Sequence, residues 1–154
     1  MPATYRALAD TFVTESGIVM VHCSDPRYQP YCQEFLQKGL GVKHYALIAV
    51  PGGAHFLTLS EYLPKFSWAG WRWTKFLFDL QKVTRVILIA HDDCRWYQDL
   101  RFGFRPRPMR EHQIEDLQAV AREIRTRFAG VRPELYYAKM DAGQVTFEAL
   151  QPVS

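Results

Sequence analysis

The sequence lacks the long apolar runs and the paired cysteines that mark membrane proteins and disulfide-stapled proteins. No stretch reaches the ~20 consecutive apolar residues that a membrane helix requires, and residues 1–12 contain no apolar signal core. The three cysteines, Cys23, Cys32 and Cys94, cannot all pair within the chain, and a chain of 154 residues does not need disulfides to fold. We therefore expect a soluble, cytoplasmic protein whose thiols are reduced and free to bind a metal.

The sequence also lacks a strong excess of one charge. It has 19 Lys and Arg against 16 Asp and Glu, which gives a formal net charge of +3. Arg101, Arg105, Arg107 and Arg110 form a local cluster, which is more typical of a solvated loop or an ion-pair surface than of a nucleic-acid-binding site. Apolar residues are abundant at 48%, enough to build one core, so we expect a single domain over residues 1–154.

Strand and helix patterns alternate along most of the chain. Three apolar runs have the length of strands that are buried on both faces of a sheet: residues 18–22, 45–50 and 86–90. Helical patterns occupy residues 31–38 and 66–82, and a third follows Pro108 and stops at Gly130. This alternation predicts parallel strands with helices packed on the sheet.

Two further features concern helix faces and the start of the chain. In the segment 66–82, a helix would place several large side chains on one face: Trp73, Phe76, Leu77 and Leu80. Its aromatic surface is large enough either to pack in the core or to form a subunit contact. Residues 5–13 predict a short amphipathic helix before the first strand.

The end of the chain predicts an antiparallel hairpin. Residues 135–140 and 145–150 have strand character and flank Asp141, Ala142 and Gly143, a three-residue turn typical of hairpins. The expected fold is therefore α/β, an open sheet with a parallel core, flanking helices and an antiparallel C-terminal edge hairpin.

Potential metal ligands lie at the ends of two of the predicted parallel strands. Cys23 closes the first run, and His91 and Cys94 close the third. The carboxyl ends of parallel strands are where such sheets place functional groups, so we expect the three side chains to meet. Thiolate and imidazole are preferred ligands of zinc, and three protein ligands leave a fourth position open. We also expect the turn after His91 to enter a helix whose N-terminus favours the Cys94 thiolate.

Asp25 and Arg27 follow Cys23 at spacings that let all three project to one side of an extended segment. Asp25 can accept a hydrogen bond from a zinc-bound water or occupy the fourth position itself. Arg27 would hold Asp25 ionised and aimed in either case. Asp92 and Asp93 can steer the ligands or cap a helix.

Taken together, Cys-Ser-Asp-Pro-Arg at 23–27 and His-Asp-Asp-Cys at 91–94 resemble the paired zinc motifs of the β-class carbonic anhydrases. The resemblance implies reversible hydration of carbon dioxide to bicarbonate by a zinc-bound hydroxide. It also implies that Cys23, His91 and Cys94 hold Zn²⁺, that Asp25 and Arg27 orient the hydroxide, and that the chain forms a homodimer or a higher homo-oligomer.

The chain departs from the family pattern at two places. The segment 50–54 reads Val-Pro-Gly-Gly-Ala and lacks an arginine and an asparagine, and Arg95 replaces the glycine after the last zinc cysteine. Two alternatives therefore stay open. One is a hydrolase of carbon disulfide or carbonyl sulfide. The other is a non-catalytic zinc protein in which Asp25 fills the fourth position and Arg95 blocks access.

The remaining histidines and the third cysteine are expected to have structural roles. His22 should point to the sheet face opposite to Cys23 and act as a core histidine. His44 and His55 are expected to bond to solvent or a loop rather than to shuttle protons, His112 to be exposed on a helix, and Cys32 to be structural. Gly52 and Gly53 predict a tight turn, although their amides can also approach an anion.

Overall fold

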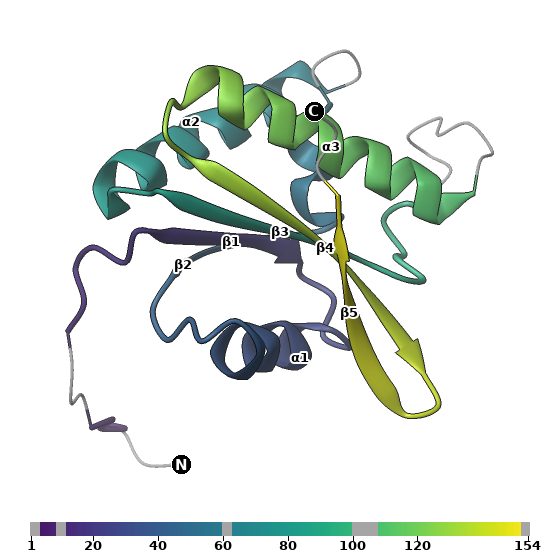
Figure 1. Ribbon diagram of the computed structural model, residues 1–154, viewed down its shortest axis with the longest axis horizontal. Coiled ribbons are helices and arrows are strands. Elements are labelled where there is room, and N and C mark those ends of the chain that lie inside the picture. The colour runs from purple at the N-terminus through teal and green to yellow at the C-terminus, as the bar shows by residue number, and fades with distance from the viewer. Residues whose placement is uncertain (1–3, 9–11, 60–62, 100–107, 152–154) are drawn as a thin grey trace.

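The computed structural model describes residues 4–8, 12–59, 63–99 and 108–151. In this part of the chain, five strands form one sheet in the order β2-β1-β3-β4-β5 (Figure 1). The strands are β1 (Ile18–Cys23), β2 (Ala46–Val50), β3 (Arg85–His91), β4 (Arg132–Asp141) and β5 (Gln144–Leu150). β1 to β4 pair in parallel, and β5 pairs with β4 in antiparallel orientation. The predicted parallel core and antiparallel C-terminal edge are both confirmed.

Helices cover both faces of the sheet. α2 (Pro64–Gln81) and α3 (Met109–Arg127) lie on one face, and α1 (Gln29–Glu34) lies on the other, continued by a π-helical turn (Phe35–Gly39) (Figure 1). Neighbouring strand residues alternate between the two layers. Val19 and Val21 pack in the core cluster under α2 and α3, whereas Met20 packs in the cluster under α1. This double burial explains why the strands read as continuous apolar runs.

A short 3-10 helix (Gly53–Leu57), which sequence patterns did not predict, follows β2 and is buried along its whole length. α2 packs closely against it. The buried residues of α2 are Ser67, Gly70, Thr74 and Phe78. A Cβ atom on Gly70 would lie 2.2 Å from Cε2 of Phe56, so the two elements approach closely only because Gly70 has no side chain.

The outward face of α2 differs from the usual amphipathic pattern. Trp73, Phe76 and Leu80 are exposed, and Leu77 alone of the four predicted face residues packs against the core. Small inward residues allow the close approach to the 3-10 helix, so the large side chains lie on the outside. Hydrophobicity alone therefore does not identify the buried face of this helix.

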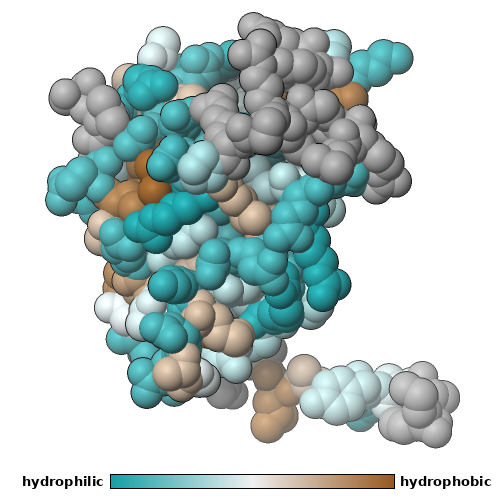
Figure 2. All heavy atoms as spheres, turned by 90° about the vertical axis from the view of Figure 1, so that its right-hand side faces the viewer, coloured by the Kyte–Doolittle hydropathy of each residue, from teal (hydrophilic) through white to brown (hydrophobic). Residues whose placement is uncertain are grey.

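The predicted helix over residues 5–13 is wrong in the part that the structure describes. Residues 4–8 have no regular secondary structure, and Tyr5 and Leu8 are exposed. The segment stands apart from the body of the molecule at its lower edge (Figure 2). A helix this short is not stable without a packing partner, and the described apolar residues Tyr5 and Leu8 are 85% and 96% exposed.

The hairpin turn is one residue shorter than expected. Asp141 pairs with Gln144, so it belongs to β4, and the loop is Ala142 and Gly143. Both loop residues have positive φ, at 47° and 77°, as two-residue hairpin loops of type I′ require.

Most of the predicted arginine cluster lies outside the described residues. Arg101, Arg105 and Arg107 lie outside the described residues, while Arg110 pairs with Glu148 at 2.7 Å. Among the residues that the structure describes, no helix has the length and apolar character needed to cross a membrane.

Candidate metal centre

The candidate centre lies where two adjacent parallel strands end. β1 pairs with β2 on one side and with β3 on the other, so the chain leaves β1 and β3 toward opposite edges of the sheet. Cys23 is the last residue of β1, His91 is the last residue of β3, and Cys94 follows three residues later. A switch point of this kind leaves a crevice at the carboxyl ends of the strands.

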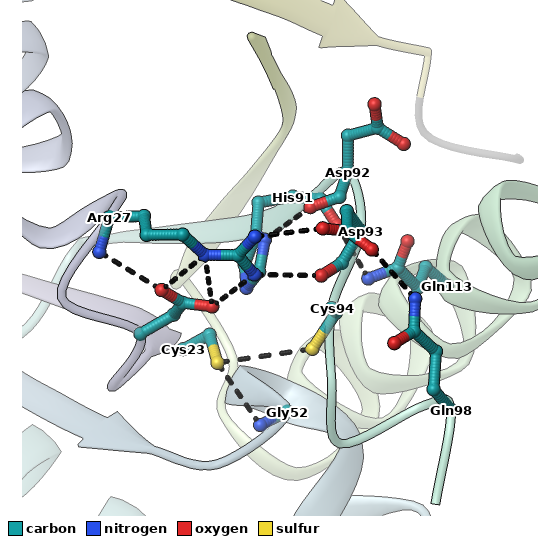
Figure 3. Close-up of polar contacts among 10 residues, drawn as sticks. Cys23, Arg27, Gly52, His91, Asp92, Asp93, Cys94, Gln98 and Gln113 are labelled. Atoms are coloured by element: carbon teal, nitrogen blue, oxygen red, sulfur yellow. Dashed lines mark hydrogen bonds and ion pairs between the residues drawn. The ribbon is translucent and has the colours of Figure 1, made fainter.

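The structure brings the three expected ligands together. Cys23, His91 and Cys94 are all buried, and their ligand atoms lie within 4.8 Å of one another. The two sulfur atoms are 3.9 Å apart, and they face each other in Figure 3. Two thiolates on a tetrahedral zinc, with Zn–S bonds of about 2.3 Å, would be separated by about 3.8 Å. The arrangement therefore fits one zinc ion.

His91 is oriented as a metal ligand. Its Nδ1 lies 2.7 Å from the carbonyl oxygen of Asp92, so Nδ1 carries the proton and donates it to that oxygen. Nε2 is then left with a free lone pair. Within the described residues, it is the single buried side-chain nitrogen or oxygen that has no hydrogen-bond partner. A buried polar atom without a partner is costly, and a metal ion would satisfy it.

Backbone amides surround the two sulfur atoms. The amide of Gly52 donates to Cys23 Sγ at 3.4 Å, and the amides of Trp96 and Tyr97 donate to the sulfur of Cys94. The two sulfur atoms also share a hydrogen bond in which either can be the donor, and this contact lowers the pKa of Cys23 and raises the pKa of Cys94. In the part of the chain that the structure describes, no helix begins directly after Cys94, because residues 95–98 form turns. Amides of a turn take its place.

Gly52 has two structural roles in the segment 50–54, which departs from the pattern of the β-class carbonic anhydrases. It has a φ of 78°, and a Cβ atom there would lie 2.2 Å from Cδ1 of Trp96. Both expected roles of this segment therefore occur together. The chain turns tightly against the indole ring, and one amide reaches a sulfur atom that can carry negative charge.

Asp25 and Arg27 form a tight ion pair beside the sulfur atoms. Arg27 donates to both carboxylate oxygens of Asp25, at 3.0 Å from Nε and 2.7 Å from Nη2. This contact is the main reason that the pKa of Asp25 falls to about 2. Arg27 also donates from Nη1 to Asp93 at 2.8 Å, so it ties the two strand tips together (Figure 3). Asp25 is not part of the group of close ligand atoms.

A cleft of about 320 Å³ opens beside Cys23, with Asp25 and Arg27 in its wall. Pro51, Arg95 and Trp96 complete the lining, so Arg95 borders the opening. An apolar cavity of about 390 Å³ shares Pro51 and Trp96 with this cleft. The centre is thus reached through a charged opening that adjoins an apolar surface.

Two of the remaining residues behave as expected. His22 is buried and its Nδ1 lies 2.6 Å from the carbonyl oxygen of Cys23, as a satisfied core histidine. Cys32 is buried and belongs to neither group of possible metal ligands among the described residues, and burial raises the pKa of its thiol to about 12.

His55 bonds to the loop residue Trp96, in line with the expectation, but the expectation that His112 is exposed is wrong. His55 is buried and His112 is half-buried, and both lie beside Asp116, at 3.9 Å and 3.6 Å from its Oδ2. Trp96 Nε1 donates to His55 Nδ1 at 3.2 Å, so neutral His55 carries its proton on Nε2, the nitrogen that faces Asp116. A protonated nitrogen cannot bind a metal, and this second group is therefore a hydrogen-bonded network. The i,i+4 spacing on α3 links His112 to Asp116, but no sequence spacing links this pair to His55 and Trp96, which come from two other segments.

The class of protein is defined first by the fold and the candidate site, and then by comparison with known proteins. The fold and the candidate site first define an α/β protein with a Cys₂His group at a switch point of a mostly parallel sheet. The fold is, more narrowly, that of the β-class carbonic anhydrases. Neither protein-family models nor curated proteins give a match to the sequence, so the likeness is structural.

Two solved structures carry the likeness. One is the β-carbonic anhydrase isoform I from Trichomonas vaginalis, with 16% identity, a TM-score of 0.53, and coverage of 92% of this chain and 87% of that one. The other is a β-carbonic anhydrase of Aspergillus fumigatus, with 13% identity, a TM-score of 0.53, and coverage of 92% and 78%. The shared fold thus spans nearly the whole chain.

Proposed function

We propose that the protein is a zinc-dependent lyase that hydrates carbon dioxide reversibly to bicarbonate. Cys23, His91 and Cys94 are the proposed zinc ligands. The observation that carries the proposal is the unpartnered, buried Nε2 of His91 next to two sulfur atoms 3.9 Å apart. The fold likeness to two β-carbonic anhydrases supports the same activity.

The residues around the centre have distinct roles in this proposal. Zinc, when bound, would lower the pKa of a water to about 7 and so supply a nucleophile near neutrality. Asp25 accepts a hydrogen bond in the cleft and orients the attacking water. Arg27 keeps Asp25 ionised above a pH of about 2 and fixes both of its oxygens, which favours orientation of water over direct binding to the metal. His91 keeps its Nε2 unprotonated by donating from Nδ1 to Asp92.

A second candidate function is hydrolysis of carbonyl sulfide or carbon disulfide. The apolar cavity that shares Pro51 and Trp96 with the cleft favours it, because such a surface suits a small apolar substrate. We also propose a cytoplasmic location, where the two ligand thiols stay reduced. We also propose that the protein forms a homo-oligomer.

Stopped-flow measurement of carbon dioxide hydration tests the proposal in the zinc-loaded protein. Cys94→Ser should lose stoichiometric zinc, because it removes a thiolate ligand. Asp25→Ala should keep zinc but lose at least about 100-fold in kcat, since the water is no longer oriented. Cys32→Ala is the matched control, because this buried cysteine lies outside the centre, and its zinc content and rate should equal those of the unaltered protein.

Two results would count against the proposal. A protein with one zinc per chain that is no faster than buffer would be a non-catalytic zinc protein. Turnover of carbonyl sulfide or carbon disulfide in place of carbon dioxide would favour the second candidate.

A further inference from the structure

Two of the three proposed ligands lie in the ligand loop, residues 91–99. The first residue of this loop is hydrogen-bonded to α3. Gln113 donates from Nε2 to the backbone carbonyl oxygen of His91 at 2.9 Å, and Gln113 is only 1% exposed. The hydroxyl of Tyr137 donates to Gln113 Oε1 at 3.1 Å, which fixes the orientation of the amide group. The position of His91 is thus set from α3.

α3 also contacts the ligand loop farther along, at Tyr97. Asp116 lies three residues after Gln113 and therefore on the same side of α3. It accepts a hydrogen bond from the hydroxyl of Tyr97 at 2.7 Å. Close by, His55 accepts one from Trp96, and the ring of Tyr97 stacks on His55 with centroids 4.5 Å apart.

Trp96 and Tyr97 therefore each make one contact through the side chain and another through the backbone. Their side chains are anchored on His55 and Asp116, while their backbone amides donate to the sulfur of Cys94. Residues 95–98 form turns, so the amides are aimed by a turn and not by the first turn of a helix. The direction of the amides depends on what holds the two side chains.

We propose that Asp116 is a positioning residue for the metal centre, which acts on Cys94 through Tyr97. The inference rests on the proposed function, because it requires Cys94 to be a metal ligand. His55 supports the same turn through Trp96. When the Tyr97 hydroxyl loses its partner, the turn can rotate, the amides leave the sulfur atom, and the thiolate is less well stabilised and less well aimed.

Metal binding by the full chain tests this inference apart from activity. The zinc Kd is measured by competition with a chromophoric chelator, and the same proteins are loaded with Co²⁺ to record the thiolate-to-cobalt charge-transfer and d–d bands. Tyr97→Phe and Asp116→Ala should each raise the zinc Kd about 10- to 100-fold and change the cobalt spectrum. The effect of the double variant should be smaller than the sum of the two single effects, because both variants break the contact between Tyr97 and Asp116.

Two further variants separate positioning from general stability. Asp116→Asn keeps an oxygen that can accept from Tyr97, so it should restore most of the affinity and the spectrum. Tyr136→Phe is the matched control, because its hydroxyl also donates to a carboxylate, that of Glu134 at 3.3 Å, without contacting the ligand loop. Its zinc Kd should be unchanged.

The outcomes are distinct. If Tyr97→Phe and Asp116→Ala lower the melting temperature but keep the zinc Kd and the cobalt spectrum, Asp116 is merely structural and the inference is overturned, while the proposed function stands. If Asp116→Ala does not fold, the conservative Tyr97→Phe decides in the same way. An unaltered protein that binds no zinc would overturn the proposed function and this inference together.

Discussion

Gly52 serves the candidate centre through its backbone alone. Its amide reaches Cys23 Sγ at 3.4 Å, and the indole of Trp96 fills the space that a side chain would occupy. Trp96 in turn offers its own amide to Cys94. Gly52 therefore contacts Cys23 directly and lies against Trp96, whose amide reaches Cys94.

Replacement of Gly52 by alanine should both destabilise the protein and weaken metal binding. A positive φ costs a non-glycine residue roughly 1–2 kcal/mol, and displacement of Trp96 should add about 1–3 kcal/mol of overpacking. Gly41→Ala is the control, because Gly41 has a similar φ of 68° but open space around its Cβ position. Urea unfolding and zinc competition measure both effects. Equal losses in the two variants would show that contact with Trp96 does not matter.

The side-chain ligands could be predicted from sequence, but most of their backbone partners could not. Cys23, His91 and Cys94 have a chemistry that few other residues share, and they follow recognisable strands. Every residue except proline carries an amide, so nothing in the sequence singles out the amides of Trp96 and Tyr97, whereas the glycines at 52 and 53 did indicate amides that can approach an anion. The burial of His55 could not be predicted for a related reason, since it depends on residues distant in sequence.

At the scale of elements, α2 shows where hydrophobic patterns mislead. The strands β1 and β3 were predictable, because burial on both faces demands uninterrupted apolar residues, and the edge strand β2 has a similar apolar run. α2 was predictable as a helix but not in its orientation. Its contact with the 3-10 helix uses Gly70 and other small residues, and this closeness leaves Trp73 and Phe76 outside.

Gly70→Ala should destabilise the fold, although alanine favours a helix. The gain in helix stability is about 0.5–1 kcal/mol, whereas a Cβ atom placed 2.2 Å from Cε2 of Phe56 should cost about 1–3 kcal/mol in overpacking. Urea unfolding measures the difference. In a Phe56→Leu background the ring is gone, so the same change should cost less or stabilise. A more stable Gly70→Ala variant in the unaltered background would contradict the close approach.

At the scale of the whole molecule, exposed aromatic surface gathers on one side. Trp68, Trp73 and Phe76 are 71%, 57% and 62% exposed, all on α2. Patches of this kind are uncommon on proteins that stay monomeric. Trp73 also lines the apolar cavity that shares Trp96 with the cleft, so a second copy seated there would border the candidate centre.

We therefore expect the purified protein to form a homodimer or a higher homo-oligomer through α2. Light scattering after size-exclusion chromatography gives the mass of the particle. The double variant Trp73→Ala and Phe76→Ala should shift it to the mass of one chain while circular dichroism stays unchanged, because both side chains are already exposed. Tyr31→Ala, an exposed aromatic of α1 on the opposite face of the sheet, should leave the mass as it is. If the unaltered protein has the mass of one chain at micromolar concentrations, the aromatic face of α2 has another role. If the double variant is monomeric and also loses activity with zinc still bound, the partner copy completes the cleft.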